Sequence, residues 1–325
     1  MSQSRAELSI IVPAFREGQG LVQAIGRIRA SALQATDNIE VIVVDDGSDD
    51  DTWTHIQALV SAYPDVRGIR FSRNYGKDSA VAAGLDDCVG DAAVIIDADL
   101  QHPPALIPQF YRHWKNGYLV VSAVKRARED EPFFRRIASG LFNRIATRMT
   151  SLDLRSSTDC KLLARPVITA WKNLGEYRMF FRGMVDWLGF EQLTVPFDVA
   201  PSIRRDSTWS SVKLLRLATF SVISFSSMPL RIAHVISGLF LLFSLILGAD
   251  ALFLWVTDRA VTGFTTVIIL ILLAGGLQLG VLAIIAEYLA GVYEEVKRRP
   301  RYVITEKAAS ASRMNLLRSA GMTLR

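Results

Sequence analysis

Two carboxylates one residue apart, Asp97 and Asp99, follow the short apolar run Val94 to Ile96. The pair Pro103-Pro104 comes soon afterwards and can end an extended segment and begin a helix. Two Asp at positions i and i+2 of a strand end can share one hard divalent cation with a phosphate-bearing ligand. An isolated D-x-D is more often ordinary turn chemistry, so the rest of the chain decides which role applies.

Two other predicted strands also end in residues that could face a ligand. The run Ile39 to Val44 leads into Asp45 and Asp46, and an earlier apolar run is stopped at Pro13. Strands alternate with helices here, which predicts an α/β domain with a mostly parallel sheet and helices on both faces. Ligands of such sheets bind at the carboxyl ends of the strands. The expected strands are Leu8 to Ala14, Ile39 to Val44, Val66 to Phe71, Ala92 to Ile96 and Tyr118 to Val124, and the expected helices are Glu17 to Leu33, Asp50 to Ala62, Lys77 to Cys88 and Ala105 to Lys115.

Composition and missing motifs narrow the class of protein. Of the 325 residues, 50% are hydrophobic, a high share that directs attention to membrane spans. The two cysteines, Cys88 and Cys160, lack metal-ligand spacing, so neither a disulfide nor zinc is implied. The motifs of dinucleotide-binding and P-loop NTPase sites do not occur. Met1 to Glu7 is polar, without the apolar core of a signal peptide, so the first domain is expected in the cytosol.

Two long apolar segments, Ile232 to Val256 and Phe264 to Ala286, are predicted to span a membrane. Each is longer than the roughly 20 helical residues that cross a hydrocarbon core of about 30 Å. The alternative is a buried helical hairpin of a soluble protein. The connection Thr257 to Gly263 is nearly neutral, whereas Lys and Arg flank the two outer ends, so both ends are expected in the cytoplasm. Asp250 could be functional or could simply lie at the membrane interface.

The segments around these spans are predicted to include membrane-surface elements. Phe133 to Met149 and Thr208 to Met228 have the apolar faces of amphipathic helices, which could lie on a membrane or pack on the domain. From Gly291 onward, eight Lys and Arg stand against three Glu, which fits an anionic membrane surface better than nucleic acid. The predicted division is a cytosolic catalytic domain (1–205), an amphipathic juxtamembrane segment (206–231), a transmembrane hairpin (232–290) and a basic cytoplasmic tail (291–325).

A set of motifs occurs in the order in which one enzyme family has them. They are V-P-A-F-R-E (12–17), V-V-D-D-G-S-D-D-D-T (43–52), S-R-N-Y-G-K (72–77), D-A-D-L-Q-H-P-P (97–104), S-F-S-S-M-P-L-R (224–231) and A-E-Y-L-A-G-V-Y-E-E-V-K-R-R-P-R-Y (286–302). Together they resemble the family 2 glycosyltransferases that act on polyprenyl phosphate, the group of dolichol-phosphate mannose synthase and bactoprenol glucosyltransferase. The resemblance extends from about Leu8 to Thr305 and includes both apolar spans.

The resemblance implies a Rossmann-like GT-A fold, a nucleotide-sugar donor, Mg²⁺ or Mn²⁺, and inversion at the anomeric carbon. Asp97 and Asp99 match the metal and diphosphate motif, with Asp99 as the direct metal ligand. Gln101 matches a residue beside the reacting sugar. Lys77 and Asn74 lie on a loop at the same sheet edge, where they could contact the donor or simply be solvated, and a turn role is expected for Asp45. The other positions that match donor-binding residues are Pro13, Phe15, Glu17, Val44, Asp46 and Ala98.

The lipid phosphate of the acceptor requires cations. Asp159 lies in a segment that matches the family, and we expect it to orient the attack or help to position the metal, because an ionised phosphate needs no base. The family usually has cations where this chain has Ser202 and Thr208, so neighbouring arginines could supply that charge from shifted positions. The candidate cations for the acceptor phosphate are Lys125, Arg126, Arg128, Arg204 and Arg205, with Arg136 and Arg144 as further candidates.

The resemblance predicts transfer of one hexose from a nucleotide sugar, UDP-glucose as the first choice, to polyprenyl (undecaprenyl) phosphate on the cytoplasmic face of a bacterial-type inner membrane. The lipid-linked sugar would serve modification of a surface glycan. A homo-oligomer, such as a tetramer, is expected, and no nucleic-acid partner. One alternative is a processive polysaccharide synthase, but the additional spans and the Q-x-x-R-W segment that it needs are not found. Another is a non-catalytic membrane scaffold, which only the altered loop at Ser202 and Thr208 supports.

Overall fold

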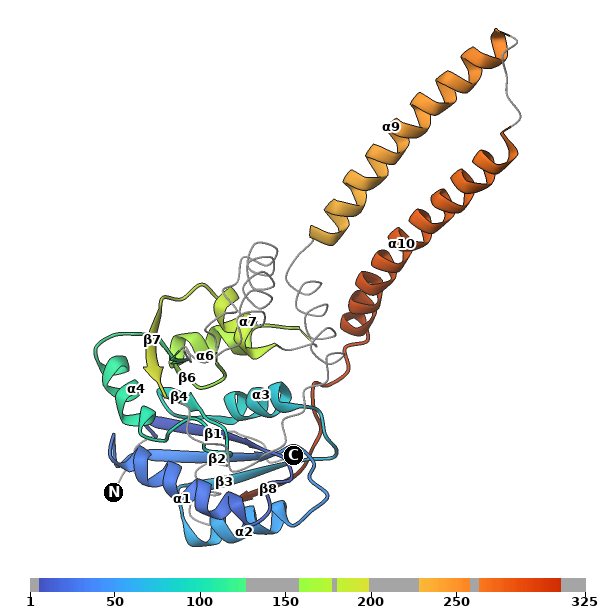
Figure 1. Cartoon of the computed structure of the whole chain (residues 1–325). Coiled ribbons are helices and arrows are strands. Elements are labelled where there is room, and N and C mark those ends of the chain that lie inside the picture. Colours follow the sequence, from blue (N-terminus) through green and yellow to red (C-terminus); the bar gives the residue numbers. More distant parts are fainter. Residues whose placement is uncertain (1–5, 127–157, 177–179, 199–227, 258–262, 311–325) are drawn as a thin grey trace. The chain divides into compact units, whose positions relative to one another are not determined.

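The computed structural model describes residues 6–126, 158–176, 180–198, 228–257 and 263–310 (Figure 1). These residues form two compact units. Unit 1 contains the described residues up to 198 together with those from Arg299 onward, and unit 2 contains those from 228 to Arg298. The two expected amphipathic helices, Phe133 to Met149 and Thr208 to Met228, lie outside the described residues, except for Met228 itself.

Unit 1 is built on one sheet, whose described strands have the order β7-β5-β6-β4-β1-β2-β3-β8. Its central strands are parallel, because β1 pairs with β2 on one side and with β4 on the other, and β2 pairs with β3. Among the described strands only β6 and β8 run antiparallel to their neighbours, which confirms the predicted mostly parallel sheet. The strands are β1 (Leu8–Ala14), β2 (Ile39–Asp45), β3 (Val66–Phe71), β4 (Ala92–Ile95), β5 (Val120–Lys125), β6 (Lys161–Ala164), β7 (Gln192–Phe197) and β8 (Ile304–Ala309).

Helices cover both faces of this sheet, as predicted (Figure 1). On one face, α1, α2 and α4 pack on a core to which β1 contributes alternate residues, among them Ile10 and Val12. On the other face, α3 lies so close to β1 that a Cβ at Gly84 would be 2.3 Å from the Ile11 side chain. The helices of unit 1 are α1 (Gly20–Leu33), α2 (Thr52–Ala62), α3 (Lys77–Asp87), α4 (Leu106–Lys115), α6 (Arg165–Lys172) and α7 (Phe181–Trp187).

The first helix begins later than its apolar spacing predicts. The expected start was Glu17, whereas α1 begins at Gly20. The backbone N–H groups of Glu17 and Gly18 both donate to Oγ1 of Thr52 at 3.0 Å, and Gly18 has a φ of 52°. These bonds hold the segment after β1 against the start of α2, so the residues before Gly20 form part of a turn at the sheet edge.

The tail beyond the apolar segments contributes a strand that the sequence analysis did not identify. β8 pairs antiparallel with β3, and just before it the Tyr302 ring stacks on Phe71 with centroids 4.9 Å apart. The Tyr302 hydroxyl donates to Oδ2 of Asp86 at 2.8 Å, and the N–H of Ser72 donates to the carbonyl of Val303 at 3.0 Å. Residues 302–309 are therefore an edge of the sheet of unit 1.

A network of buried ion pairs and hydrogen bonds ties four strands to α3. Glu40 of β2 is fully buried and accepts hydrogen bonds from Ser9 Oγ of β1 at 2.6 Å and from Arg67 Nη2 of β3 at 2.8 Å. Arg67 also binds Asp87 at the end of α3 at 2.5 Å, and Lys307 of β8 binds the same carboxylate at 2.9 Å. Burial would lower the pKa of Arg67, but Glu40 and Asp87 outweigh it and raise that pKa.

We expect Arg67→Met to lower the free energy of unfolding by about 3–5 kcal/mol, because it leaves the Glu40 carboxylate buried without its cation. Lys115→Met is the matched control, since Lys115 pairs with Glu7 at the surface and such pairs contribute roughly 0–1 kcal/mol. Thermal unfolding of the full-length protein in detergent, followed by tryptophan fluorescence, measures the difference. An equal decrease in the free energy of unfolding in the two variants would contradict the stabilising role of the buried network.

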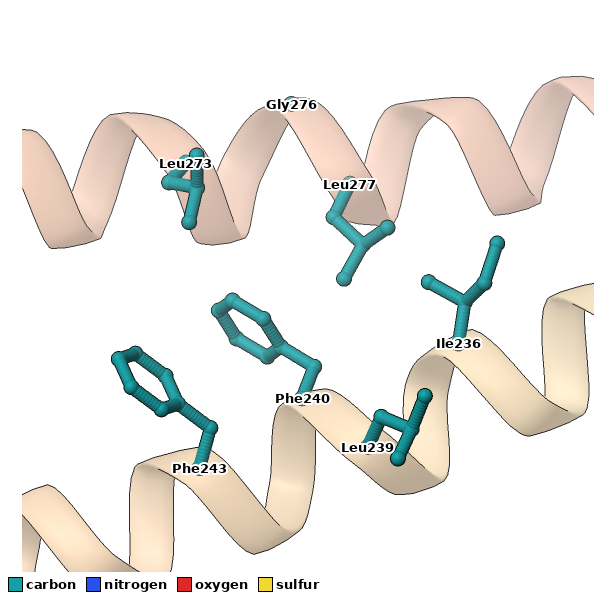
Figure 2. A pocket seen from close by; sticks show the side chains of 7 residues that line it. All are labelled: Ile236, Leu239, Phe240, Phe243, Leu273, Gly276 and Leu277. Atoms are coloured by element: carbon teal, nitrogen blue, oxygen red, sulfur yellow. The ribbon is translucent and has the colours of Figure 1, made fainter.

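Unit 2 contains, among its described residues, the helices α9 (Met228–Val256) and α10 (Phe264–Val296). The stretches Ala233–Asp250 and Leu273–Val296 are long and apolar enough to cross a membrane. Only 6% of the first and none of the second is buried, which argues against a buried hairpin. Figure 2 shows Phe240 and Phe243 of α9 directed toward α10, at an apolar groove of about 670 Å³. The groove is lined by Ile236, Leu239, Phe240, Phe243, Leu273, Gly276 and Leu277.

Candidate active site

The strand order places the predicted site at one edge of the sheet. In the sheet, β2 and β3 follow β1 on one side, whereas β4 lies on the other side of β1. Connections therefore diverge at the carboxyl ends of β1 and β4, which is where ligands bind in open parallel sheets. The N–H of Asp46 donates to the carbonyl of Ala14 at 2.9 Å, so the ends of β1 and β2 are also joined at this edge.

Asp46 holds the loop that leads into α3. Its carboxylate accepts the backbone N–H of Tyr75 at 2.7 Å and that of Gly76 at 2.9 Å. Burial raises the pKa of Asp46, although these two donors oppose the shift. Asp45 has the expected turn contact, because Oδ1 accepts the N–H of Ser48 at 3.0 Å. Asp46 thus fixes the backbone just before Lys77.

The loops after β2 and β3 pack on each other, and this contact requires glycine at position 47. Gly47 has a φ of 69°, in the left-handed region that L side chains rarely adopt. A Cβ there would be 2.3 Å from the carbonyl carbon of Arg73. The close approach brings the acidic turn of β2 and the 72–76 loop together at the site.

Two carboxylates and two cations form the centre of the site. Lys77, at the start of α3, lies 2.6 Å from Oδ1 of Asp97 and 2.6 Å from Oδ2 of Asp159. Arg182 of α7 binds the same Asp159 through two nitrogens, Nε at 2.5 Å and Nη2 at 2.8 Å. Asp159 therefore lies between the two cations, and Lys77 joins it to the D-x-D motif.

The charges around Asp159 decide its protonation state. Burial would raise the pKa of Asp159, but the hydrogen bonds from Arg182 and the charges of Lys77 and Arg182 outweigh it, and the pKa lies far below its usual range. Both carboxylate oxygens already accept hydrogen bonds. Asp159 is therefore suited to anchoring cations and poorly suited to accepting a proton.

The turn after β4 carries the rest of the motif. Leu100 has a φ of 57°, and Oδ1 of Asp99 accepts the N–H of Gln101 at 3.0 Å, so the turn is closed by one of its own carboxylates. Ala98 is buried, whereas Asp97 and Asp99 are partly exposed. His102 is buried against Phe197, with Nδ1 3.7 Å from Oδ2 of Asp97.

The residues of this turn fit a divalent cation. Asp97 and Asp99 supply the carboxylate oxygens that Mg²⁺ and Mn²⁺ prefer. No group of three or more His, Cys, Asp and Glu is placed for a metal among the described residues, so phosphates of a ligand would complete the coordination. Within the part of the chain that the structure describes, neither buried ring nitrogen of His102 has a hydrogen-bond partner, which leaves capacity for a further hydrogen bond beside Asp97.

The other residues predicted to bind the donor lie at the same edge of the sheet, and their side chains differ in solvent exposure. Pro13, Phe15 and Glu17 are partly exposed at and after the end of β1. Val44 is fully buried within β2, so its side chain does not face solvent in this state. The donor contacts of these residues stay predictions.

The predicted acceptor residues are only partly covered by the structure. Lys125 and Arg126 are exposed at the end of β5, and Arg126 pairs with Asp198 at 3.1 Å. Asp250 is exposed on α9. The remaining candidates, Arg128, Arg136, Arg144, Arg204 and Arg205, and the altered positions Ser202 and Thr208, lie outside the described residues.

Sequence reasoning missed Arg182 and Tyr75. Arg182 lies in Phe180-Phe181-Arg182-Gly183, a stretch without acidic or glycine-rich spacing that would mark a site. Tyr75 contributes its backbone N–H to Asp46, a role that its side-chain type does not reveal. The only signal for Arg182 in the sequence is a basic side chain in a mostly apolar stretch.

Comparisons with known proteins show the family of the chain. The model of glycosyl transferase family 2 matches residues 9–165. The chain is 35% identical over 302 residues to the uncharacterized glycosyltransferase sll0501 of Synechocystis sp., covering 92% of this chain and 95% of that protein. It is 32% identical over 304 residues to the bactoprenol glucosyl transferase of Shigella phage SfII, covering 92% and 97%.

The chain is also similar to a solved structure. Glucosyl-3-phosphoglycerate synthase from Mycobacterium tuberculosis, in complex with Mn²⁺, UDP and phosphoglyceric acid, matches 68% of this chain and 77% of that one. The TM-score is 0.50 at 21% identity, and the match shows the predicted GT-A fold. Fold and full-length relatives lead to one assignment: the chain belongs to the family 2 glycosyltransferases.

Proposed function

We propose that this glycosyltransferase moves one hexose from UDP-glucose to undecaprenyl phosphate, a polyprenyl phosphate, at the cytoplasmic face of a bacterial inner membrane. The observation that carries the proposal is the cluster of Lys77, Asp97, Asp159 and Arg182 beside Asp99 at the carboxyl ends of the central strands. Full-length relatives named bactoprenol glucosyl transferase support the lipid acceptor. The lipid-linked hexose would serve the modification of a surface glycan.

The donor diphosphate is expected at the D-x-D turn. When bound by Asp97 and Asp99, Mg²⁺ or Mn²⁺ would supply positive charge that stabilises the departing nucleoside diphosphate. Asp46 fixes the loop before Lys77, and Phe15 and Glu17 lie at the same edge for contact with the nucleoside. Lys77 lies where its ammonium group can exchange a carboxylate partner for a phosphate oxygen.

The acceptor needs orientation more than activation. A phosphate monoester has a second pKa of about 6, so it is already an anionic nucleophile near neutral pH. A lipid phosphate oxygen attacks the anomeric carbon as the bond to the diphosphate breaks, which inverts the configuration. Asp159 holds Lys77 and Arg182 on the two sides of its carboxylate, and these cations would orient the reacting phosphates.

The apolar helices would hold the catalytic unit at the membrane that contains the lipid acceptor. We place α9 and α10 across the membrane, with both outer ends in the cytoplasm, because Lys297, Arg298, Arg299 and Arg301 follow the second helix. An anionic leaflet stabilises such flanking cations by about 1 kcal/mol each. Assembly into a homo-oligomer, such as a tetramer, belongs to the same proposal.

The proposal predicts a lipid product that forms only with a metal ion. Purified full-length protein is incubated with radiolabelled UDP-glucose, undecaprenyl phosphate and Mg²⁺ or Mn²⁺. The expected product is soluble in chloroform and labile to mild acid; it is absent without the lipid and with EDTA, and it returns when the metal is restored in excess.

Other outcomes contradict specific parts of the proposal. A product formed only from another nucleotide sugar would correct the donor, and a water-soluble polymer would indicate a processive synthase. If no nucleotide sugar of a panel gives a product, the alternative of a non-catalytic membrane protein would be supported. Undiminished transfer after EDTA treatment would exclude the metal-binding role of Asp97 and Asp99.

A further inference from the structure

The helix that supplies Arg182 depends on its neighbours for its position. α7 (Phe181–Trp187) has seven residues, too few to be stable as an isolated helix. Its first N–H, that of Phe181, donates to Oδ1 of Asp78 in α3 at 3.1 Å. Arg182 then binds Asp159, and its side chain is 41% exposed, so it can also reach a ligand. What fixes the other end of α7 therefore affects the candidate site.

A second ion pair lies one helical turn farther along α7. Asp186 follows Arg182 by four residues, a spacing of about 6 Å along one helix face. Its Oδ1 lies 3.3 Å from Nζ of Lys161, which follows Asp159 by two residues at the start of β6. The charges are reversed between the two pairs, so the ion pairs favour one alignment of α7 with residues 159–161: Arg182 on Asp159 and Asp186 on Lys161.

The second pair is mostly buried and belongs to a closed set of hydrogen bonds. Only 1% of the Lys161 side chain is exposed, and its Nζ also donates to Oε1 of Gln192 at 3.1 Å. Nε2 of Gln192 donates to Oδ1 of Asp186 at 2.7 Å, and Ser122 Oγ donates to Oε1 of Gln192 at 3.0 Å. Because unpaired buried charges are costly, this set strongly favours one arrangement of β5, β6, β7 and α7.

We propose that Lys161, Asp186 and Gln192 form a latch that positions α7 so that Arg182 stays on Asp159 in the active site. These are positioning residues, since among the residues that the structure describes their side chains bond to one another and to Ser122, and not to Lys77 or Asp97. The latch acts on the alignment of charge during the reaction, so its loss should lower turnover more than donor binding. The kinetic part of this inference rests on the proposed glycosyl transfer.

Kinetics of latch variants give the first test. Asp186→Asn keeps the size of the side chain and an oxygen for Gln192 but removes the charge that pairs with Lys161. We expect kcat to fall about tenfold, while KM for UDP-glucose changes less than about threefold. Lys161→Met should act in the same way, and Lys161→Arg should restore most of the rate. Lys172→Met, an exposed lysine of α6, is the matched control and should stay within about twofold of wild type.

A double-variant cycle separates positioning from general destabilisation. If the latch acts through Arg182, adding Asp186→Asn to Arg182→Met should lower kcat by less than about twofold further. A fold defect would instead lower kcat by the same factor in both backgrounds. Multiplicative losses, or equal losses in KM and kcat, would overturn the proposal.

Hydrogen exchange tests the latch without any activity. In the full-length protein, Asp186→Asn should increase exchange of the α7 amides at 182–188, with exchange in β1 and β4 unchanged. Unchanged α7 exchange would refute the latch even if transfer occurs. Faster α7 exchange in a protein that transfers no sugar would support the latch while refuting the proposed function, so the two failures are distinguishable.

Discussion

Replacing Asp99 with Asn is expected to lower hexose transfer to undecaprenyl phosphate by about 10³-fold, or about 4 kcal/mol of transition-state stabilisation. The substitution keeps the size of the side chain and its capacity to accept the N–H of Gln101 at 3.0 Å, so the turn after β4 should persist. It removes the negative charge that would hold the metal at the donor diphosphate. The rate of formation of the radiolabelled lipid product measures the effect.

A control and a metal titration make this result specific. Asp37→Asn changes an exposed carboxylate away from the site and should leave the rate within about twofold of wild type. In Asp99→Asn, higher Mn²⁺ should recover part of the lost rate if the defect is weak metal binding. A rate near that of wild type at low metal concentration would contradict the role given to Asp99.

Asp159→Asn is expected to lower kcat by about 10²- to 10³-fold, because Lys77 and Arg182 lose the anion that they share. An amide offers one oxygen and presents an N–H₂ group to one of the two cations, so both cannot keep their places. If Asp159 acted only as a general base, its strongly lowered pKa would already make it ineffective. Steady-state kinetics with both substrates measure the change in kcat.

Two further variants separate anchoring from proton transfer. Lys77→Met and Arg182→Met should each lower kcat while leaving Asp159 present, and adding Asp159→Asn to either should cost less than it does in the wild type. Near-normal turnover of Asp159→Asn would remove this residue from the mechanism. Full additivity with both cation variants would show that Asp159 acts independently of them.

The first half of the sheet could be predicted because its strands are buried on both faces. β1 and β3 have the predicted bounds. A strand that is buried on both faces of a parallel sheet is recognised in the sequence as a short, nearly continuous apolar run such as Leu8–Ala14. Later strands lack that signal. β7 contains Pro196, which is tolerated because β7 lies at the edge of the sheet, and β8 reads Ile-Thr-Glu-Lys-Ala-Ala, a polar edge strand.

The candidate site was predictable where motif and topology coincide. Asp46, Asp97 and Lys77 are named by short motifs at strand ends, and a parallel sheet brings those ends together. Arg182 was not predictable, because its partner Asp159 is 23 residues away and a short helix of mixed composition carries it. Its position depends on ion pairs between segments that only the folded sheet brings together.

The edge strand β8 also sets the order in which the protein can be completed. Thr305, which bonds to the carbonyl of Arg70, lies 235 residues later in the chain. Because chains are made from the N-terminus, the outer edge of β3 stays open while both apolar helices are synthesised. The N–H of Ser72, beside the loop that Asp46 holds, receives its partner Val303 only then. A newly made chain can therefore complete this edge of the sheet only after both apolar helices have been synthesised, so the folding of unit 1 finishes after the synthesis of unit 2.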